Sequence, residues 1–427
     1  MAKSTPQKWR ALNIYSIQVR NFSTAGTFNA IHSDLDRIHY LGTDIILFLP
    51  FYPLIGETGN HAIPYKMKDL RQIDARYGTK EEFELLVKEI HKRNMKVMID
   101  IGFNHTADPI LIEEYPDWFD HKAANTINKE INNSADLIIL DDGDQGLWED
   151  QIEILKEWAK LVDGFHCETA SLIPLEFWRK ARSEIQKNKP HFIWLAETLE
   201  RDLIKRLRKE HLIAYSDSEL YTVFDLTYDY DVQKEYEDYL TGNAPLSKYI
   251  DALNRQDSTY PWNYVKVCFL ENHKYGRMID FLPDIDSLIQ WAAFNYLQKG
   301  ATLIYNGQEV ASKKLPHLFD KDPIDWDTGI NLSSYIAHLA QIKKDHVPIV
   351  NVEYDLQAFD ALDTIVMYYV DQEEKRIGVF NLKHKVGKVP IAIPDGEYQN
   401  LLNNHLIEIE DGQIELIDSP VFFIANY

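Results

Sequence analysis

Carboxylate and imidazole side chains follow several short apolar segments, at positions where buried parallel strands are expected to end. Residues 162–167 lead into Glu168, and residues 193–196 lead into Glu197. A lone acid or histidine at a strand end is usually a cap, but the ends of parallel strands can meet on one face. Five such ends therefore favour a catalytic pocket. The candidate groups at these ends are Asp100, His105, His166, Glu168, Glu197, His273 and Lys274.

Strand-like and helix-like segments alternate from Leu12 to about Lys343, a pattern typical of parallel strands covered by helices. The expected strands are residues 14–19, 44–50, 96–101, 162–167, 192–196, 222–225, 265–269 and 302–305. The expected helices are residues 28–41, 148–161, 175–185, 202–210, 232–253, 285–298 and 334–343, with one more capped by Thr79 and Glu82. Eight strands predict a (β/α)8 TIM barrel rather than a doubly wound sheet, since no GxGxxG motif follows the first strand.

The pattern changes after Pro348, where short strand-like runs alternate with Asp-Gly turns. These runs are residues 362–370, 376–381, 389–393, 407–409, 414–416 and 421–424. We expect a barrel domain at residues 1–347, with a short insertion after its third strand. An antiparallel β-sandwich domain is expected at residues 348–427.

The composition narrows the classes of partner. The chain has 427 residues and a net charge of -22, so it would be repelled by nucleic acid and by anionic membranes. Cys167 and Cys268 are too few for a disulfide framework and are expected in the core. Residues 1–20 lack the apolar segment of a signal peptide, and the longest apolar run, 45–55, is too short to span a bilayer. A cytoplasmic location is expected.

The motifs at the strand ends resemble those of the α-amylase family of glycoside hydrolases. Residues 100–105 look like the first signature of that family, and residues 164–170 stand where its second belongs. Glu197 stands at the third, and Asn272 with His273 at the fourth. Two flanking stretches, residues 74–79 and 304–309, also match, so the resemblance covers essentially the whole chain.

The resemblance implies a retaining mechanism on an α-linked glucan or maltooligosaccharide. Glu197 takes the position of the general acid, and Glu168 takes that of the nucleophile. The sugar-binding positions fall on Asp100, His105 and His273, and an aromatic platform falls on Tyr65. For Tyr65, simple packing in a loop is an equal alternative.

Three signature positions depart from the family pattern. The family has aspartate at Glu168, arginine at His166 and aspartate at Lys274. An ammonium near Glu197 would lower the pKa of that acid, which makes it a poorer proton donor. We expect Lys274 to pair with Glu168 or Glu197 and to occupy part of the sugar site.

No metal and no cofactor are expected. The family often binds calcium after the third strand, but only Asn104 of that ligand set is recognisable, because residues 171–173 replace a common calcium contact. Asp141, Asp142 and Asp144 lack the closing glutamate of a calcium loop, so an acidic turn is favoured.

Two functions from different classes stay open. The first is an α-amylase-like hydrolase whose activity is weakened or retuned at Glu168, His166 and Lys274. The second is a catalytically silent carbohydrate-binding or regulatory protein on the same scaffold. A metal-dependent hydrolase is disfavoured, because the strand ends carry no ligand cluster with the spacing of a metal site.

Overall fold

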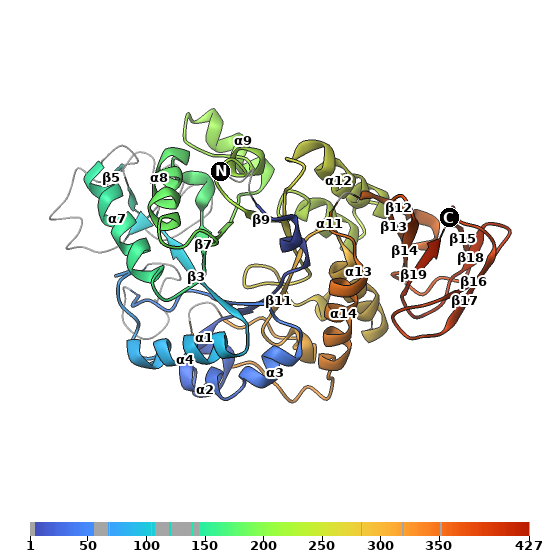
Figure 1. Cartoon of the computed structure of the whole chain (residues 1–427), viewed down its shortest axis with the longest axis horizontal. Helices are drawn as coiled ribbons and strands as arrows, with labels where there is room; N and C mark the ends of the chain where they lie inside the picture. Colours follow the sequence, from blue (N-terminus) through green and yellow to red (C-terminus); the bar gives the residue numbers. More distant parts are fainter. Residues whose placement is uncertain are drawn as a thin grey trace.

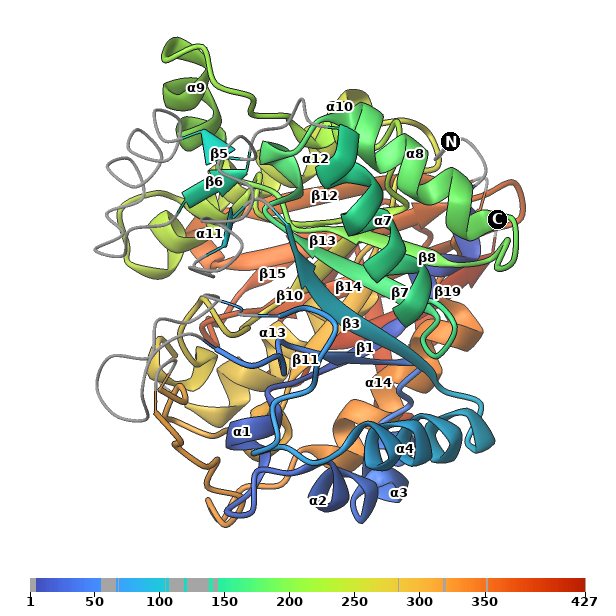
Figure 2. The same ribbon diagram turned by 90° about the vertical axis from the view of Figure 1, so that its left-hand side faces the viewer.

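Eight parallel strands form a closed barrel in the computed structural model (Figure 1). The barrel closes where β1 pairs with β11. The structure describes residues 5–54, 67, 69–103, 105–106, 119–120, 138–140, 145–282, 284–317, 320–350 and 352–426. The barrel strands are β1 (Asn13–Ile17), β2 (Ile45–Phe48), β3 (Lys96–Gly102), β7 (Gly164–Glu168), β8 (Ile193–Ala196), β9 (Leu226–Tyr228), β10 (Lys266–Phe269) and β11 (Ala301–Tyr305). β3, β7 and β8 are consecutive neighbours in the barrel, and Figure 2 shows β3 and β7 side by side.

Helices cover the outer face of the barrel (Figure 1). They are α1 (Val19–Phe22), α2 (Phe28–His32), α3 (Leu35–Tyr40), α4 (Lys80–Lys92), α7 (Gln145–Trp158), α8 (Leu175–Gln186), α9 (Arg201–Lys209), α10 (Asp217–Leu220), α11 (Gln233–Leu240), α12 (Leu246–Thr259), α13 (Ile285–Leu297) and α14 (Ser333–His346). α4 begins with the expected capping box, in which Thr79 and Glu82 each satisfy a backbone N–H of the other. Among the described residues, no helix has the length and apolar character needed to cross a membrane.

Alternating side chains of the strands fill two layers of core. One set points into the barrel and packs there, including Ile14, Leu47, Leu195 and Val267, all buried. The other set points outward and packs against the helices. Because each strand is buried on both faces, its sequence is mostly apolar, and its few polar residues, such as Ser16, Thr227 and Lys266, are buried as well.

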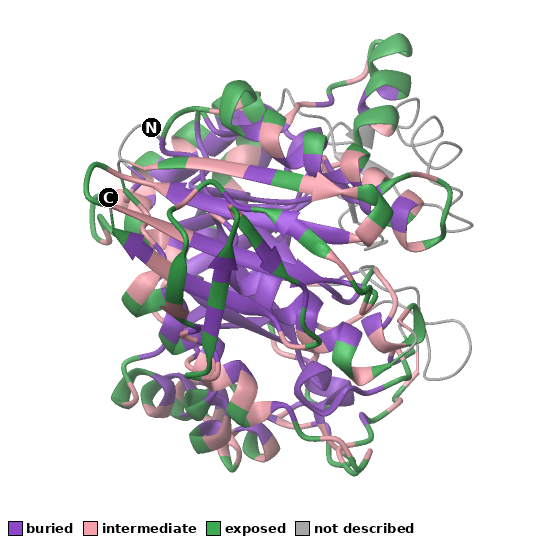
Figure 3. Cartoon of the chain, turned by 90° about the vertical axis from the view of Figure 1, so that its right-hand side faces the viewer, coloured by how far each residue is buried: buried purple, intermediate pink, exposed green. Residues whose placement is uncertain are grey.

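Two antiparallel sheets follow the barrel. The first has the order β12-β13-β14-β19, and the second has the order β15-β18-β17-β16. Their strands are β12 (Glu353–Phe359), β13 (Thr364–Val370), β14 (Glu374–Asn381), β15 (Lys388–Pro390), β16 (Gly396–Gln399), β17 (Leu406–Glu410), β18 (Gln413–Glu415) and β19 (Val421–Asn426). Buried and exposed residues alternate along β17 and β18, as expected of strands with one solvated face (Figure 3). A small sheet of β4 (His105–Thr106), β6 (Ile138–Leu140) and β5 (Phe119–Asp120) lies between β3 and α7 in the chain.

The predicted fold class is confirmed, with a closed parallel barrel and antiparallel sheets after it. Three segment predictions were wrong. The strand expected at residues 222–225 is β9 (Leu226–Tyr228) instead. The single helix expected at 232–253 is two helices, because Gly242, with a φ of 76°, follows the end of α11, and Pro245 then precedes α12. The helix expected at 28–41 is likewise two, α2 and α3.

Gly300 connects α13 to β11 where the chain has no room for a side chain. A Cβ at this position would lie 2.7 Å from Sγ of Cys268 and 2.7 Å from the backbone oxygen of Lys266. We expect Gly300→Ala to lower the free energy of unfolding by about 1–3 kcal/mol, because the backbone atom cannot move aside. Chemical denaturation followed by circular dichroism measures this loss.

Gly387→Ala is the matched control for that variant. The three atoms nearest to its added Cβ all belong to the side chain of Leu362, the nearest at 2.8 Å, and a leucine side chain can rotate away. We expect its loss of stability to be clearly smaller than that of Gly300→Ala. Equal losses for the two variants would contradict the steric argument.

Candidate active site

The carboxyl ends of three adjacent strands bring acidic and imidazole groups together. In the register of the barrel, Asp100 of β3 lies beside His166 of β7, and Gly102 lies beside Glu168. Glu197 directly follows β8, whose Ala196 pairs with Cys167. These four polar side chains are buried, with exposed fractions of 5% or less. The barrel register therefore dictates that side chains far apart in sequence share one small volume.

His166 connects two of the carboxylates. Its Nδ1 lies 3.0 Å from Oδ2 of Asp100, and its Nε2 lies 3.5 Å from Oε2 of Glu197. Burial disfavours the ionised form of Asp100. A protonated His166 between Asp100 and Glu197 offsets part of the repulsion between these two carboxylates. Burial works against the charged imidazole, yet the carboxylate of Asp100 outweighs it and raises the pKa of His166.

Glu197 is surrounded by donors. The ammonium of Lys274 contacts its Oε1, and the Tyr230 hydroxyl donates to the same oxygen at 3.4 Å. Burial alone would raise the pKa of Glu197, but the charges of Lys274 and His166 outweigh it and bring that pKa down to about 2. At neutral pH this carboxyl group is therefore ionised.

Glu168 has the opposite environment. Its Oε2 is buried and makes no hydrogen bond among the described residues. Burial first, and then the charge of Asp100, raise the pKa of Glu168 well above its usual range. Gly102 makes room for this side chain, because a Cβ there would lie 3.0 Å from Oε2 of Glu168. Burial and the charge of Asp100 therefore favour the neutral form of the Glu168 carboxyl group.

Lys274 and His273 follow β10 and enter the site from its other side. The side chain of Lys274 is 38% exposed and lies at the edge of the site, while His273 is only 2% exposed. Burial opposes the charge of Lys274, but the carboxylates of Glu197 and Glu168 outweigh it and raise the pKa of Lys274. Burial brings the pKa of His273 down to about 3, so this imidazole is neutral at physiological pH. The expected pairing of Lys274 with one of the two glutamates is found at Glu197.

A buried ion pair shapes the segment that carries His273 and Lys274. Nη1 of Arg277 donates to Oε1 of Glu271 at 2.5 Å, and Nη2 donates to the backbone oxygen of Asn306 at 2.9 Å. The backbone N–H of Met278 donates to the other oxygen of Glu271 at 2.7 Å. These hydrogen bonds hold residues 271–278 in a compact turn and connect that turn to Asn306, just after β11.

Some predicted site residues fall outside what the structure describes. Tyr65 lies outside the described residues, and of His105 only the backbone, in β4, is described. Asn104 and the acidic turn at residues 141–144 also lie outside them. Within the part of the chain that is described, no group of three or more His, Cys, Asp or Glu could hold a metal ion. The prediction that this protein binds no metal stays a prediction.

Sequence reasoning missed Tyr230. No motif marks this residue, and the strand that precedes it was placed four residues too early. The available signal was the alternation of tyrosine and aspartate at residues 228–231, which is typical of an extended segment with two different faces.

Comparisons with known proteins agree with this architecture. Residues 3–143 match the family described as "Alpha amylase, catalytic domain", and residues 355–423 match "Bacterial Alpha amylase C-terminal domain". The crystal structure of an alpha-amylase from Lactobacillus plantarum is 37% identical in sequence, with a TM-score of 0.91. That comparison covers 98% of this chain and 100% of the other. A noncanonic maltogenic alpha-amylase, AmyB from Thermotoga neapolitana, is 27% identical with a TM-score of 0.84, over 98% of this chain and 99% of that one.

Curated relatives are more distant and longer. Alpha-amylase MalA of Haloarcula japonica is 24% identical over 403 residues, which cover 90% of this chain and 57% of that protein. The chain spans between 52% and 68% of the length of the first three curated relatives.

Proposed function

Because this chain belongs to the alpha-amylase family of glycoside hydrolases, we propose that it is a retaining glycosidase acting on α-glucans or maltooligosaccharides. The observation that carries this proposal is the convergence of Glu168 and Glu197 with Asp100 and His166 at three adjacent strand ends. In such a mechanism, one carboxylate attacks the anomeric carbon and a carboxylic acid protonates the leaving oxygen. Water then hydrolyses the glycosyl-enzyme, with the former acid acting as base.

We assign each predicted residue one role in that reaction. Glu168 is the nucleophile, and Glu197 is the acid and then the base. The groups assigned to binding the sugar are Asp100, His105, His166, His273, Lys274 and, as a stacking platform, Tyr65. We also propose that the barrel domain ends near residue 347 and the β-sandwich domain begins near residue 348. The cytoplasmic location stays a prediction.

The resting protonation states oppose this reaction. Attack requires an ionised Glu168, yet burial raises its pKa well above the usual range. Protonation of the leaving group requires a neutral Glu197, yet its pKa is about 2. The productive arrangement of protons is therefore a minor state at neutral pH, and we expect slow cleavage of natural glycosidic bonds.

The choice of leaving group distinguishes the role of Glu168 from that of Glu197. Nitrophenolate leaves without a proton, so hydrolysis of 4-nitrophenyl α-maltoside does not depend on the acid form of Glu197. We expect its kcat/KM to exceed that of maltotetraose by about 100-fold or more, the usual worth of general-acid catalysis. Steady-state kinetics on both substrates with purified protein measure this ratio.

Two variants complete that experiment. Glu168→Gln should abolish turnover of both substrates, because the nucleophile is lost. Glu197→Gln should reduce formation of the glycosyl-enzyme from the aryl substrate by less than about tenfold and leave maltotetraose uncleaved. Turnover that survives Glu168→Gln would show that a contaminant or another residue does the chemistry.

A silent carbohydrate-binding protein is the second candidate, and the contact between Lys274 and Glu197 favours it. An ionised carboxylate paired with an ammonium is a poor proton donor, although the site can still bind a sugar. This candidate requires that calorimetry detect maltoheptaose binding while no reducing ends appear from either substrate. Any turnover that disappears in Glu168→Gln would exclude it.

A further inference from the structure

Residues 228–231, which begin at the last residue of β9, have two faces with different partners. The rings of Tyr228 and Tyr230 stack with centroids 4.9 Å apart and an angle of 10°, and both belong to the cluster that fills the barrel. The ring of Tyr228 packs against His166 at 5.4 Å, and Tyr230 donates to Glu197. The two tyrosines thus form one wall of the site.

Asn272 determines where the proton of Tyr230 points. Its Oδ1 accepts the backbone N–H groups of Lys274 at 2.8 Å and of Tyr275 at 3.0 Å, so this oxygen faces the backbone. Its Nδ2 therefore faces Tyr230 and donates to the phenol oxygen at 3.0 Å. Since that oxygen already accepts a hydrogen bond, its own proton is directed at Oε1 of Glu197.

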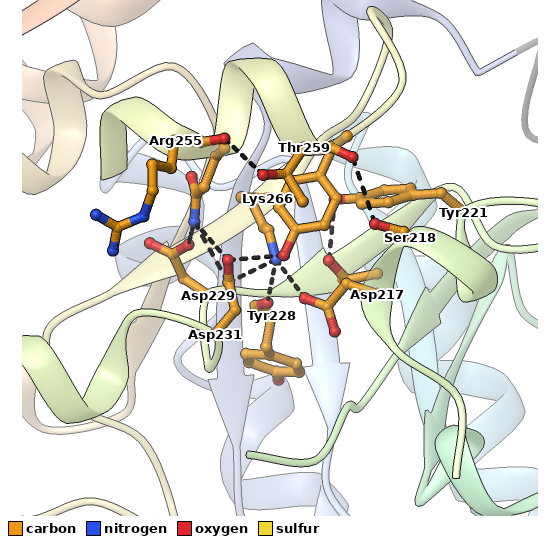
Figure 4. Close-up of polar contacts among 12 residues, drawn as sticks. Asp217, Ser218, Tyr221, Tyr228, Asp229, Asp231, Arg255, Thr259 and Lys266 are labelled. Carbon is orange, nitrogen blue, oxygen red and sulfur yellow. Dashed lines mark hydrogen bonds and ion pairs between the residues drawn. The ribbon is translucent and has the colours of Figure 1, made fainter. Parts of the chain in front are cut away.

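Asp231 of the same segment is held by a buried lysine, and Asp229 by a neighbouring glutamine. Figure 4 shows Lys266 at the centre of this network, with its ammonium 2.7 Å from Oδ1 of Asp231 and 3.2 Å from the backbone oxygen of Tyr228. Gln256 donates to Asp229 at 2.6 Å. These contacts fix the backbone at residues 228–231 on the side away from the two tyrosine rings.

We propose that Tyr230 is a positioning residue for Glu197, oriented by Asn272 and held in place by the Lys266 network through Asp229 and Asp231. The 3.4 Å contact is long for a hydrogen bond between oxygens, and such contacts commonly shorten once substrate closes the site. Its role in turnover rests on the proposed function, but its effect on the Glu197 carboxylate does not.

Tyr230→Phe tests this role by a titration that needs no activity. The protein is labelled with ¹³C at glutamate carboxyls, and the Glu197 resonance is assigned by its absence in Glu197→Gln. Loss of the donor should raise the pKa of Glu197 by about half to one unit. The other ionisable groups around this carboxylate remain in the variant; they include Lys274, His166, His273, Asp100, Glu168, Tyr228 and Tyr275.

Tyr236→Phe is the matched control. Tyr236 is also buried, but its hydroxyl donates to Sδ of Met278 at 3.0 Å and not to a group of the site. The pKa of Glu197 should stay unchanged in this variant. Asp231→Asn removes the negative charge that pairs with the ammonium of Lys266. This variant should move the pKa of Glu197 in the same direction as Tyr230→Phe, but by a smaller amount.

The outcomes are distinct. If Glu197 titrates identically in wild type, Tyr230→Phe and Tyr236→Phe, the proposed positioning is overturned. If Tyr230→Phe alone shifts the titration and Asp231→Asn does not, the anchoring through Lys266 is overturned. If the wild type turns over no glycoside, the proposed function is overturned. The titration would still test whether Tyr230 positions Glu197.

Discussion

Maltooligosaccharide turnover is expected to rise about 100-fold or more when Lys274 and Glu168 are both changed to aspartate. Lys274→Asp removes the ammonium that holds Glu197 ionised and puts an anion in its place, which raises the pKa of the acid. Glu168→Asp shortens the nucleophile by one methylene and introduces the residue type that the family resemblance implies for this position. Initial rates on maltotetraose between pH 4 and pH 8 measure the gain.

The pH dependence has a definite sign. In the wild type, Glu197 is protonated only near or below pH 2, so each unit of pH above that lowers the acid form tenfold. Raising its pKa moves the basic limb of the rate profile to higher pH. A depressed carboxyl pKa also stabilises the fold above pH 4.5, and this contribution is lost as pH falls through about 2. The double variant should therefore be more active and less stable at neutral pH.

Lys274→Met is the control for the charge alone. It removes the cation without adding an acid, so its gain on maltotetraose should lie between the wild type and the double variant. A double variant that binds maltoheptaose but cleaves maltotetraose no faster than the wild type at any pH would contradict the assignment of Lys274 as the inhibiting group.

The sequence predicted the barrel because most barrel strands are short, mainly apolar runs and several of them end next to a polar group. The same logic located Asp100, His166, Glu168 and Glu197, since parallel register brings such tips together. The β9 strand was misplaced because its three residues, Leu226–Tyr228, are too short for a periodic signal. Tyr230 was missed with it.

The electrostatic states of the site could be foreseen only in part. A lysine at the position where the family resemblance implies an aspartate predicted the direction of the pKa shift at Glu197 from charge alone. The shift at Glu168 depends on burial and on an oxygen with no hydrogen bond among the described residues, which are properties of packing and not of residue type. The network of Lys266 was equally invisible, since its partners Asp217 and Asp231 come from different elements.

That network leads to the largest expected effect on stability. Lys266 is completely buried, and its ammonium contacts Asp217 and Asp231 (Figure 4). It also lies 4.3 Å from the ring centre of Tyr260. Lys266→Met keeps most of the side-chain volume and leaves two buried carboxylates without their cation. We expect a loss of about 3–5 kcal/mol, measured by guanidinium unfolding at pH 7.

The loss should shrink in acid, which distinguishes lost charge from lost packing. Burial already raises the pKa of Asp217 above its usual value, and loss of the Lys266 charge raises it further, so the variant binds more protons when folded. The penalty is then fully present above that folded pKa and fades as pH falls through it. Lys343→Met is the matched control, because Lys343 is equally buried but its ammonium donates to neutral oxygens of Gly300 and Thr302. Its smaller loss should not shrink in acid, and a Lys266→Met penalty that is the same at pH 5 and pH 7 would mean that packing, not charge, makes this lysine necessary.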